Sequence, residues 1–226
     1  MDDTVMAALT RWPDVPDVYG WMSLSEQGQW RLHPNADAWQ TDLPCTPPFV
    51  QGESIESPQI CRFIDRNYAG DNRGRWYFQN GPQRVYVRLD AAPYILRTDS
   101  VALTLRTHNG LSVTQVESWW LDGKGRLYAL TEHGAGLVSG RDAPAVFDAM
   151  HTSNGMPLLH ELEHLNPAFF ESDNTHAAIG ALRDRPPIRV RLQTEVRHTC
   201  IVEAPLYLSD ESDLAAQLGF IHCPQP

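Results

Sequence analysis

The sequence is poor in the features that mark several common functional classes. Positive charge is scarce: 17 arginines and a single lysine, Lys124, leave a formal net charge of −10 at pH 7. Nucleic acids and anionic membrane surfaces attract clustered positive charge, so this balance argues against both as partners. No run approaches the ~20 apolar residues that cross a bilayer, and the acidic start lacks the apolar segment of a signal peptide. We therefore expect a cytoplasmic protein.

Motifs with an assigned chemistry are also few. The four cysteines stand far apart and form no C-x-x-C pair, the close spacing of zinc clusters and redox motifs: Cys45, Cys61, Cys200 and Cys223. This spacing favours buried free thiols, with a long-range disulfide as the alternative. There is no P-loop and no G-x-G-x-x-G, and Ser139 lacks the glycine that a nucleophile elbow requires two positions earlier.

The patterns that are present predict an α+β protein. The apolar share of 42% is ordinary for a folded chain, and short alternating runs separated by turn residues are typical of hairpins. We expect a curved, mainly antiparallel sheet with peripheral helices. Residues 1–140 would form a β-rich main domain, and residues 141–226 a smaller α/β segment packed on it, or both a single compact unit. The expected strands are 18–24, 29–32, 75–79, 84–89, 94–98, 101–107, 112–121, 126–131, 188–196 and 200–208, and the expected helices are 2–12, 58–68, 142–150, 158–165, 175–182 and a final one after Ser209.

The clearest local signal is an aromatic hairpin at residues 75–89. A four-residue loop from Asn80 to Gln83 would place Phe78 opposite Val85. Because side chains alternate along a strand, one face would hold Trp76, Phe78, Val85 and Val87, and it should be buried. The opposite face, here named the Arg/Tyr face, would hold Arg75, Tyr77, Arg84, Tyr86 and Arg88.

The Arg/Tyr face supports the leading functional hypothesis. Guanidinium groups beside aromatic rings bind anions and carboxylates well. We therefore expect a non-enzymatic binding or interaction protein, without a cofactor, whose partner is a small anionic ligand or an acidic peptide of an unknown protein. Arg62 and Arg66, one turn apart on the preceding helix, would extend this face. The alternative is that a neighbouring element covers the face or that it is simply solvated.

The alternative function is a zinc-dependent hydrolase. His160 and His164 have the i, i+4 spacing that directs two imidazoles at one metal, and Glu161 would then be the general base. Glu163, between the histidines, and the nearby Pro157 and Pro167 depart from the usual zinc-peptidase helix. The third ligand would be Glu171, Asp173 or His176. The competing interpretation is a short amphipathic helix whose inward residues are Leu158, Leu159, Leu162 and Leu165.

Residues 74–87, with the sequence GRWYFQNGPQRVYV, also carry a resemblance. This stretch resembles a family of uncharacterised proteins from betaproteobacteria. The agreement covers most of residues 11–140 and the last few positions, and its further stretches are 12–16, 19–21, 63–68, 131–134, 219–220 and 224–226. The resemblance implies a domain of unknown function, with no assigned substrate, cofactor or catalytic residue to carry over.

Overall fold

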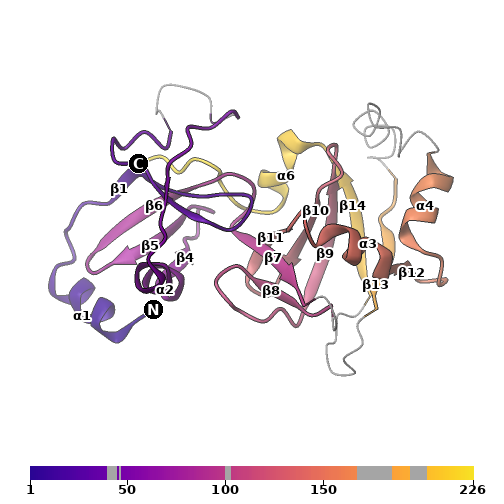
Figure 1. The fold of residues 1–226 in the computed structure, drawn as a ribbon, viewed down its shortest axis with the longest axis horizontal. Coiled ribbons are helices and arrows are strands. Elements are labelled where there is room, and N and C mark those ends of the chain that lie inside the picture. Colours follow the sequence, from indigo (N-terminus) through magenta and orange to yellow (C-terminus); the bar gives the residue numbers. More distant parts are fainter. Residues whose placement is uncertain (40–44, 46, 100–102, 167–184, 194–202) are drawn as a thin grey trace. The chain divides into compact units, whose positions relative to one another are not determined.

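The computed structural model describes residues 1–39, 45, 47–99, 103–166, 185–193 and 203–226 (Figure 1). The chain divides into a first unit, Met1–Pro93 with Gly219–Pro226, and a second unit, Tyr94–Leu218. The division falls after residue 93, whereas the sequence pattern suggested one after residue 140. The reason is strand pairing, because the strands on both sides of residue 140 belong to one sheet. The expected helix at 175–182 lies outside the described residues.

The first unit is built on a six-stranded sheet in the order β3-β2-β1-β6-β5-β4. Its central pair, β1 and β6, is parallel, and all its other pairs are antiparallel. Two helices complete the described part of this unit. The elements are α1 (Asp3–Arg11), β1 (Val18–Leu24), β2 (Trp30–Leu32), β3 (Glu53–Ser54), α2 (Pro58–Arg66), β4 (Tyr68–Gly70), β5 (Trp76–Asn80) and β6 (Gln83–Leu89).

The second unit holds an eight-stranded sheet in the order β12-β13-β14-β9-β10-β11-β7-β8. Its elements in the described residues are β7 (Tyr94–Thr98), β8 (Leu105–Thr107), β9 (Val116–Asp122), β10 (Leu127–Thr131), β11 (Gly134–Val138), α3 (Ala143–Ala149), β12 (Met150–Thr152), α4 (Leu158–Leu165), β13 (Ile188–Leu192), β14 (Ala204–Ser209) and α6 (Glu211–Gln217). Nine of the twelve strand pairings in the described residues are antiparallel. The predicted α+β class with mainly antiparallel strands is confirmed. Within the described residues, no helix combines the length and apolarity needed to cross a membrane.

Helix α2 covers the apolar face of the first sheet. Ser57 caps it by accepting a hydrogen bond from the Ile60 amide, and Pro58 occupies its first turn. Phe63 meets Phe78 edge to face, with ring centroids 6.4 Å apart. The helix ends at Arg66, two residues earlier than predicted, because Tyr68 pairs with Phe78 as the first residue of β4. Because α2 packs on the Phe78 side of the sheet, Arg62 and Arg66 lie on the opposite side from the Arg/Tyr face and do not extend it.

The hairpin formed by β5 and β6 has the predicted register, with Phe78 opposite Val85 and Tyr77 opposite Tyr86. The core side is buried as expected at Phe78, Val85 and Val87. The opposite side is buried as well: Tyr86 is fully covered, and Arg88 is 1% exposed. Most of the Arg/Tyr face is therefore covered by other parts of the first unit.

The last eight residues form part of that cover. The Leu89 amide donates to the His222 carbonyl (2.9 Å), and Arg75 donates to the Gln225 carbonyl (3.0 Å). A disulfide joins Cys45 to Cys223, so the expectation of free thiols is wrong for these two residues. The fold brings them together from 178 positions apart. Cys61 is free and half-buried, and Cys200 lies outside the described residues.

Candidate functional site

Two arginines flank a serine on the polar side of the first sheet. In the register of the strands, Ser23 of β1 pairs with Arg31 of β2 on one side and with Arg88 of β6 on the other. Residues paired in this way point to the same face of a sheet. The parallel pairing of β1 with β6 thus places two cationic side chains on one row.

Arg88 binds the loop between β2 and β3, where its partners are backbone carbonyls. Its Nε donates to Asp90 Oδ1 (2.9 Å), and its two Nη atoms donate to the carbonyls of Ala38 and Val50. The guanidinium also lies over the Phe49 ring, 4.6 Å from its centroid. Burial lowers the pKa of Arg88 and raises that of Asp90, and the ion pair between the two partly offsets both effects.

A cavity of about 290 Å³ lies beside these residues. Arg31 lines it and is half-buried, and its guanidinium donates to the Gly52 carbonyl (3.1 Å) and to Gln29 Oε1 (3.2 Å). Both acceptors are neutral, and within the described residues no carboxylate forms an ion pair with Arg31. The described residues that line it are Ser25, Glu26, Gln27, Arg31, Pro47, Phe49, Val50, Gln51, Arg88 and Asp90.

The rest of the Arg/Tyr face forms a packed cluster away from the cavity lining. Arg75 forms an ion pair with Asp71 (2.8 Å) and lies over the Tyr86 ring. The other side chains of the cluster stack in pairs, Tyr19 on Tyr86 and Arg84 over Tyr77. Of the five predicted binding residues, the structure therefore places only Arg88 at the cavity.

The serine of this row forms a serine–histidine pair that was not predicted from the sequence. Ser23 Oγ lies 2.9 Å from His33 Nε2, and His33 Nδ1 lies 3.6 Å from Asp37. These residue types form hydrolytic triads, but Ser23 is fully buried and His33 is 1% exposed. Gly52 packs directly against His33 Nε2, leaving no room there even for a Cβ atom. Burial lowers the pKa of His33, and the charge of Arg88 acts in the same direction. In this structure the pair is a buried hydrogen bond that a substrate does not reach.

The His-Glu motif of the zinc hypothesis lies on α4, with the boundaries that the sequence predicted. Leu158 and Leu162 are buried, and His160 and His164 are exposed, with ring centroids 4.4 Å apart. Glu161 instead lines a separate cavity of about 280 Å³ together with residues of β14. Within the described residues, no three His, Cys, Asp or Glu side chains gather as metal ligands. The candidate third ligands, Glu171, Asp173 and His176, lie outside these residues, so the zinc hypothesis stays a prediction.

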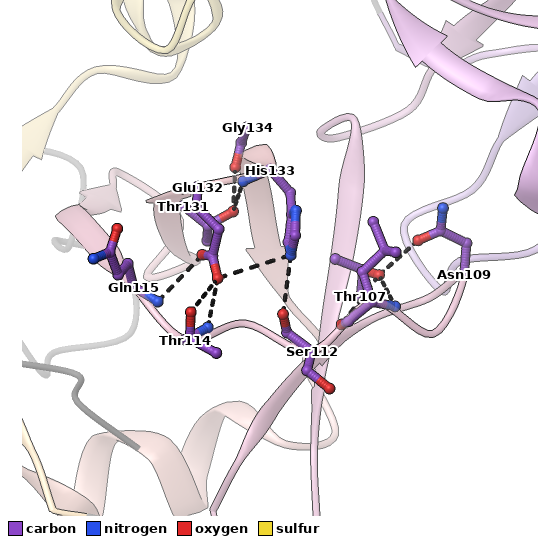
Figure 2. Close-up of polar contacts among 10 residues, drawn as sticks. Thr107, Asn109, Ser112, Thr114, Gln115, Thr131, Glu132, His133 and Gly134 are labelled. Atoms are coloured by element: carbon purple, nitrogen blue, oxygen red, sulfur yellow. Dashed lines mark hydrogen bonds and ion pairs between the residues drawn. The ribbon is translucent and has the colours of Figure 1, made fainter. Parts of the chain in front are cut away.

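A second polar cluster braces the turn between β10 and β11 (Figure 2). Glu132 accepts hydrogen bonds from the Thr114 amide (2.6 Å), the Thr114 hydroxyl (2.8 Å) and the Gln115 amide (3.2 Å). Beside it, His133 Nε2 donates to the Ser112 carbonyl (2.9 Å). Three of the roughly four acceptor positions of the carboxylate are thus occupied. This bonding supports a structural role, tying residues 112–115 to the turn.

Known proteins supply a family but no activity. No curated protein matches the sequence. Two solved structures of DUF1285 family proteins show a partial likeness. One, from Silicibacter pomeroyi DSS-3, is 19% identical over 69% of this chain and 88% of its own, with a TM-score of 0.42. The other, from Shewanella baltica OS155, is 11% identical over 56% of this chain and 89% of its own, with a TM-score of 0.37.

The sequence model of one family matches residues 1–225, well beyond the stretches on which the resemblance was first noted. The match includes the His-Glu motif of α4 as well as the aromatic hairpin. The chain belongs to the DUF2944 family, whose description reads "Protein of unknown function (DUF2946)".

Proposed function

We propose that this chain is a non-enzymatic binding protein for a small ligand that carries an anionic group. The ligand occupies the cavity beside Arg31 and Arg88. The observation that carries this proposal is the state of Arg31, a half-buried cation at a cavity wall whose described hydrogen-bond acceptors are both neutral. A charge withdrawn from water is stabilised by an opposite charge, and an anion in the cavity would supply one.

The geometry favours a small molecule over an acidic peptide. A cavity of about 290 Å³ is at the lower end of the range of small-molecule sites. An acidic peptide would need an open row of cations. Arg75 is already paired with Asp71, and Arg88 is buried. The same argument removes Tyr77 and Tyr86 from direct contact with a ligand and leaves them as packing residues.

The remaining expectations accompany this proposal. The negative net charge supports the exclusion of nucleic acid and membrane surfaces as partners. A cytoplasmic location and a betaproteobacterial origin stay predictions. A disulfide such as Cys45–Cys223 persists more readily in an oxidising compartment, so its redox state in the cell bears directly on the location.

Calorimetric titration tests the proposal. The full chain is titrated with inorganic phosphate and with a set of small carboxylates, amino acids included. We expect at least one of these anions to bind, and Arg31→Gln to weaken its binding at least tenfold. The matched control is Arg62→Gln on α2, exposed on the far side of the sheet, which should leave the affinity unchanged. Binding that is equally strong in both variants would contradict the proposal.

A further inference from the structure

We infer that the ligand of this cavity carries a cationic amine in addition to its anionic group, so that its class is the free α-amino acids. This inference rests on the proposed function. It follows from the acidic residues of the cavity lining, because Glu26 and Asp90 line the same space as Arg31 and Arg88. In the proposed function, only Arg31 and Arg88 of this lining have a role.

Asp90 is placed to accept more than its bond from Arg88. Its side chain is 19% exposed, and Arg88 bonds to its Oδ1. A carboxylate offers about four acceptor positions, so the bond from Arg88 leaves room for further donors. An ammonium group carries three donors on one compact charge and suits such a carboxylate.

The charges of the lining match a zwitterion better than a simple anion. Among the described lining residues, two arginines and two acidic residues balance each other in charge. An anion without an amine would gain contact with Arg31 and would also face the repulsion of both carboxylates. A zwitterion pairs each of its charges with an opposite one, and like charges placed next to each other reduce affinity.

The neutral lining and the size of the cavity agree with this class of ligand. The side chains of Ser25, Gln27 and Gln51 can each act as donor and as acceptor of hydrogen bonds. Phe49 and Val50 add apolar surface. A volume of about 290 Å³ is at the lower end of the range of small-molecule sites, which suits a ligand as small as a free amino acid.

The test compares amino acids with the acids that differ from them only by the missing amine. The full chain is titrated calorimetrically with glycine and acetate, alanine and propionate, aspartate and succinate, glutamate and glutarate, and phenylalanine and 3-phenylpropionate. We expect at least one amino acid to bind ten times more tightly than its partner acid. Glu26→Gln and Asp90→Asn should each reduce this preference at least threefold without weakening the partner acid.

Controls separate the possible failures. Glu56→Gln, a change at an exposed residue before α2, should keep the preference for the amino acid. Asp90→Asn removes the ion-pair partner of the buried Arg88. If this variant does not fold, the Glu26→Gln variant alone tests the preference for the amine. Partner acids that bind as tightly as the amino acids, with weaker binding in Arg31→Gln, would overturn this inference and leave the proposed function standing. No binding by any compound would overturn both.

Discussion

At the scale of single residues, the buried charges of this protein are defined by their partners. Arg88 is 1% exposed, yet it satisfies one carboxylate and two backbone carbonyls from three separate parts of the chain. Such a group stabilises a fold only while its partners remain in place, because an unpaired buried charge or carbonyl is costly. Arg88 therefore belongs both to the cavity wall and to the support of the loop that covers it.

Replacing Arg88 by methionine should destabilise the first unit by about 3 kcal/mol. The change leaves the carbonyls of Ala38 and Val50 without a donor and Asp90 without its counter-charge. Urea unfolding of the variant measures the loss. Arg62→Met is the control, since Arg62 is exposed on α2, and it should change the stability by less than about 0.5 kcal/mol. Equal losses in the two variants would show that the contacts of Arg88 contribute little.

The bonding of Glu132 predicts a dependence of stability on pH. Burial by itself raises the pKa of this carboxyl, but the hydrogen bonds from Thr114 and Gln115 outweigh it and hold the pKa below its ordinary value of 4.5. Because the folded pKa is the lower one, the stabilisation is present above pH 4.5 and is lost as the pH falls through the folded pKa. Glu132→Gln should lower the free energy of unfolding by about 1 kcal/mol at pH 7 and reduce the loss of stability between neutral and acid pH.

Denaturant unfolding at pH 7 and at pH 3.5 checks this pair of effects. Glu117→Gln, at an exposed position of β9, is the matched control and should keep the pH dependence of the parent chain. A Glu132→Gln variant that loses as much stability in acid as the parent would contradict the role assigned to this carboxylate.

At the scale of elements, the closing segment depends on a glycine that precedes β5. Gly74 has a φ of +77°, and a Cβ atom there would lie 2.6 Å from the Gly219 carbonyl oxygen. Gly74→Ala should therefore cost about 1 kcal/mol of backbone strain and a further penalty from the clash, about 2–3 kcal/mol together.

Gly125 provides the matched control for this prediction. Its φ is +74°, but nothing lies within 4 Å of an added Cβ atom. Gly125→Ala should show the backbone strain alone, about 1 kcal/mol by thermal or urea unfolding. If the two variants lose the same stability, the approach of Gly219 to Gly74 does not matter energetically.

The short helix α4 tests the zinc hypothesis at the same scale. Its two histidines are exposed, and the described residues bring no third ligand to them. Protein purified without a histidine tag should carry less than ~0.2 equivalents of zinc, and a chelator should leave its melting temperature unchanged. One equivalent of zinc that disappears in His160→Ala would instead establish a metal site.

At the scale of the whole molecule, the chain enters the first unit twice. Its last eight residues return after the second unit and are joined to Cys45 by the disulfide of Cys223. A cross-link over 178 positions restricts the unfolded chain strongly, by about 5 kcal/mol in the entropic view.

Cys45→Ser with Cys223→Ser should therefore weaken the first unit selectively. We expect amide hydrogen exchange to accelerate in β1 and β6 and to stay unchanged in β9 and β10, which belong to the second unit. Cys61→Ser is the control for the loss of a thiol. Faster exchange in both units alike, or in neither, would contradict the assignment of the disulfide to the first unit.

Much of this architecture was predictable from local patterns. The alternation and the turn residues of 75–89 predicted the register of β5 and β6, and the leucine spacing predicted α4 with its observed boundaries. These features depend on contacts between residues close in the sequence, where side-chain period and turn chemistry act directly. The sequence by itself thus determined the α+β class, most helices and strands, and which side chains share a face.

The tertiary structure alone decided which of those faces remained accessible. The parallel pairing of β1 with β6 aligned Arg31, Ser23 and Arg88, and no local pattern encodes the partner of a parallel strand. The loop before α2 has no periodicity, yet it buries Arg88 and forms a cavity wall, and a disulfide joins it to the far end of the chain. Burial depends on what packs over a face, and here the covering segments come from distant parts of the sequence.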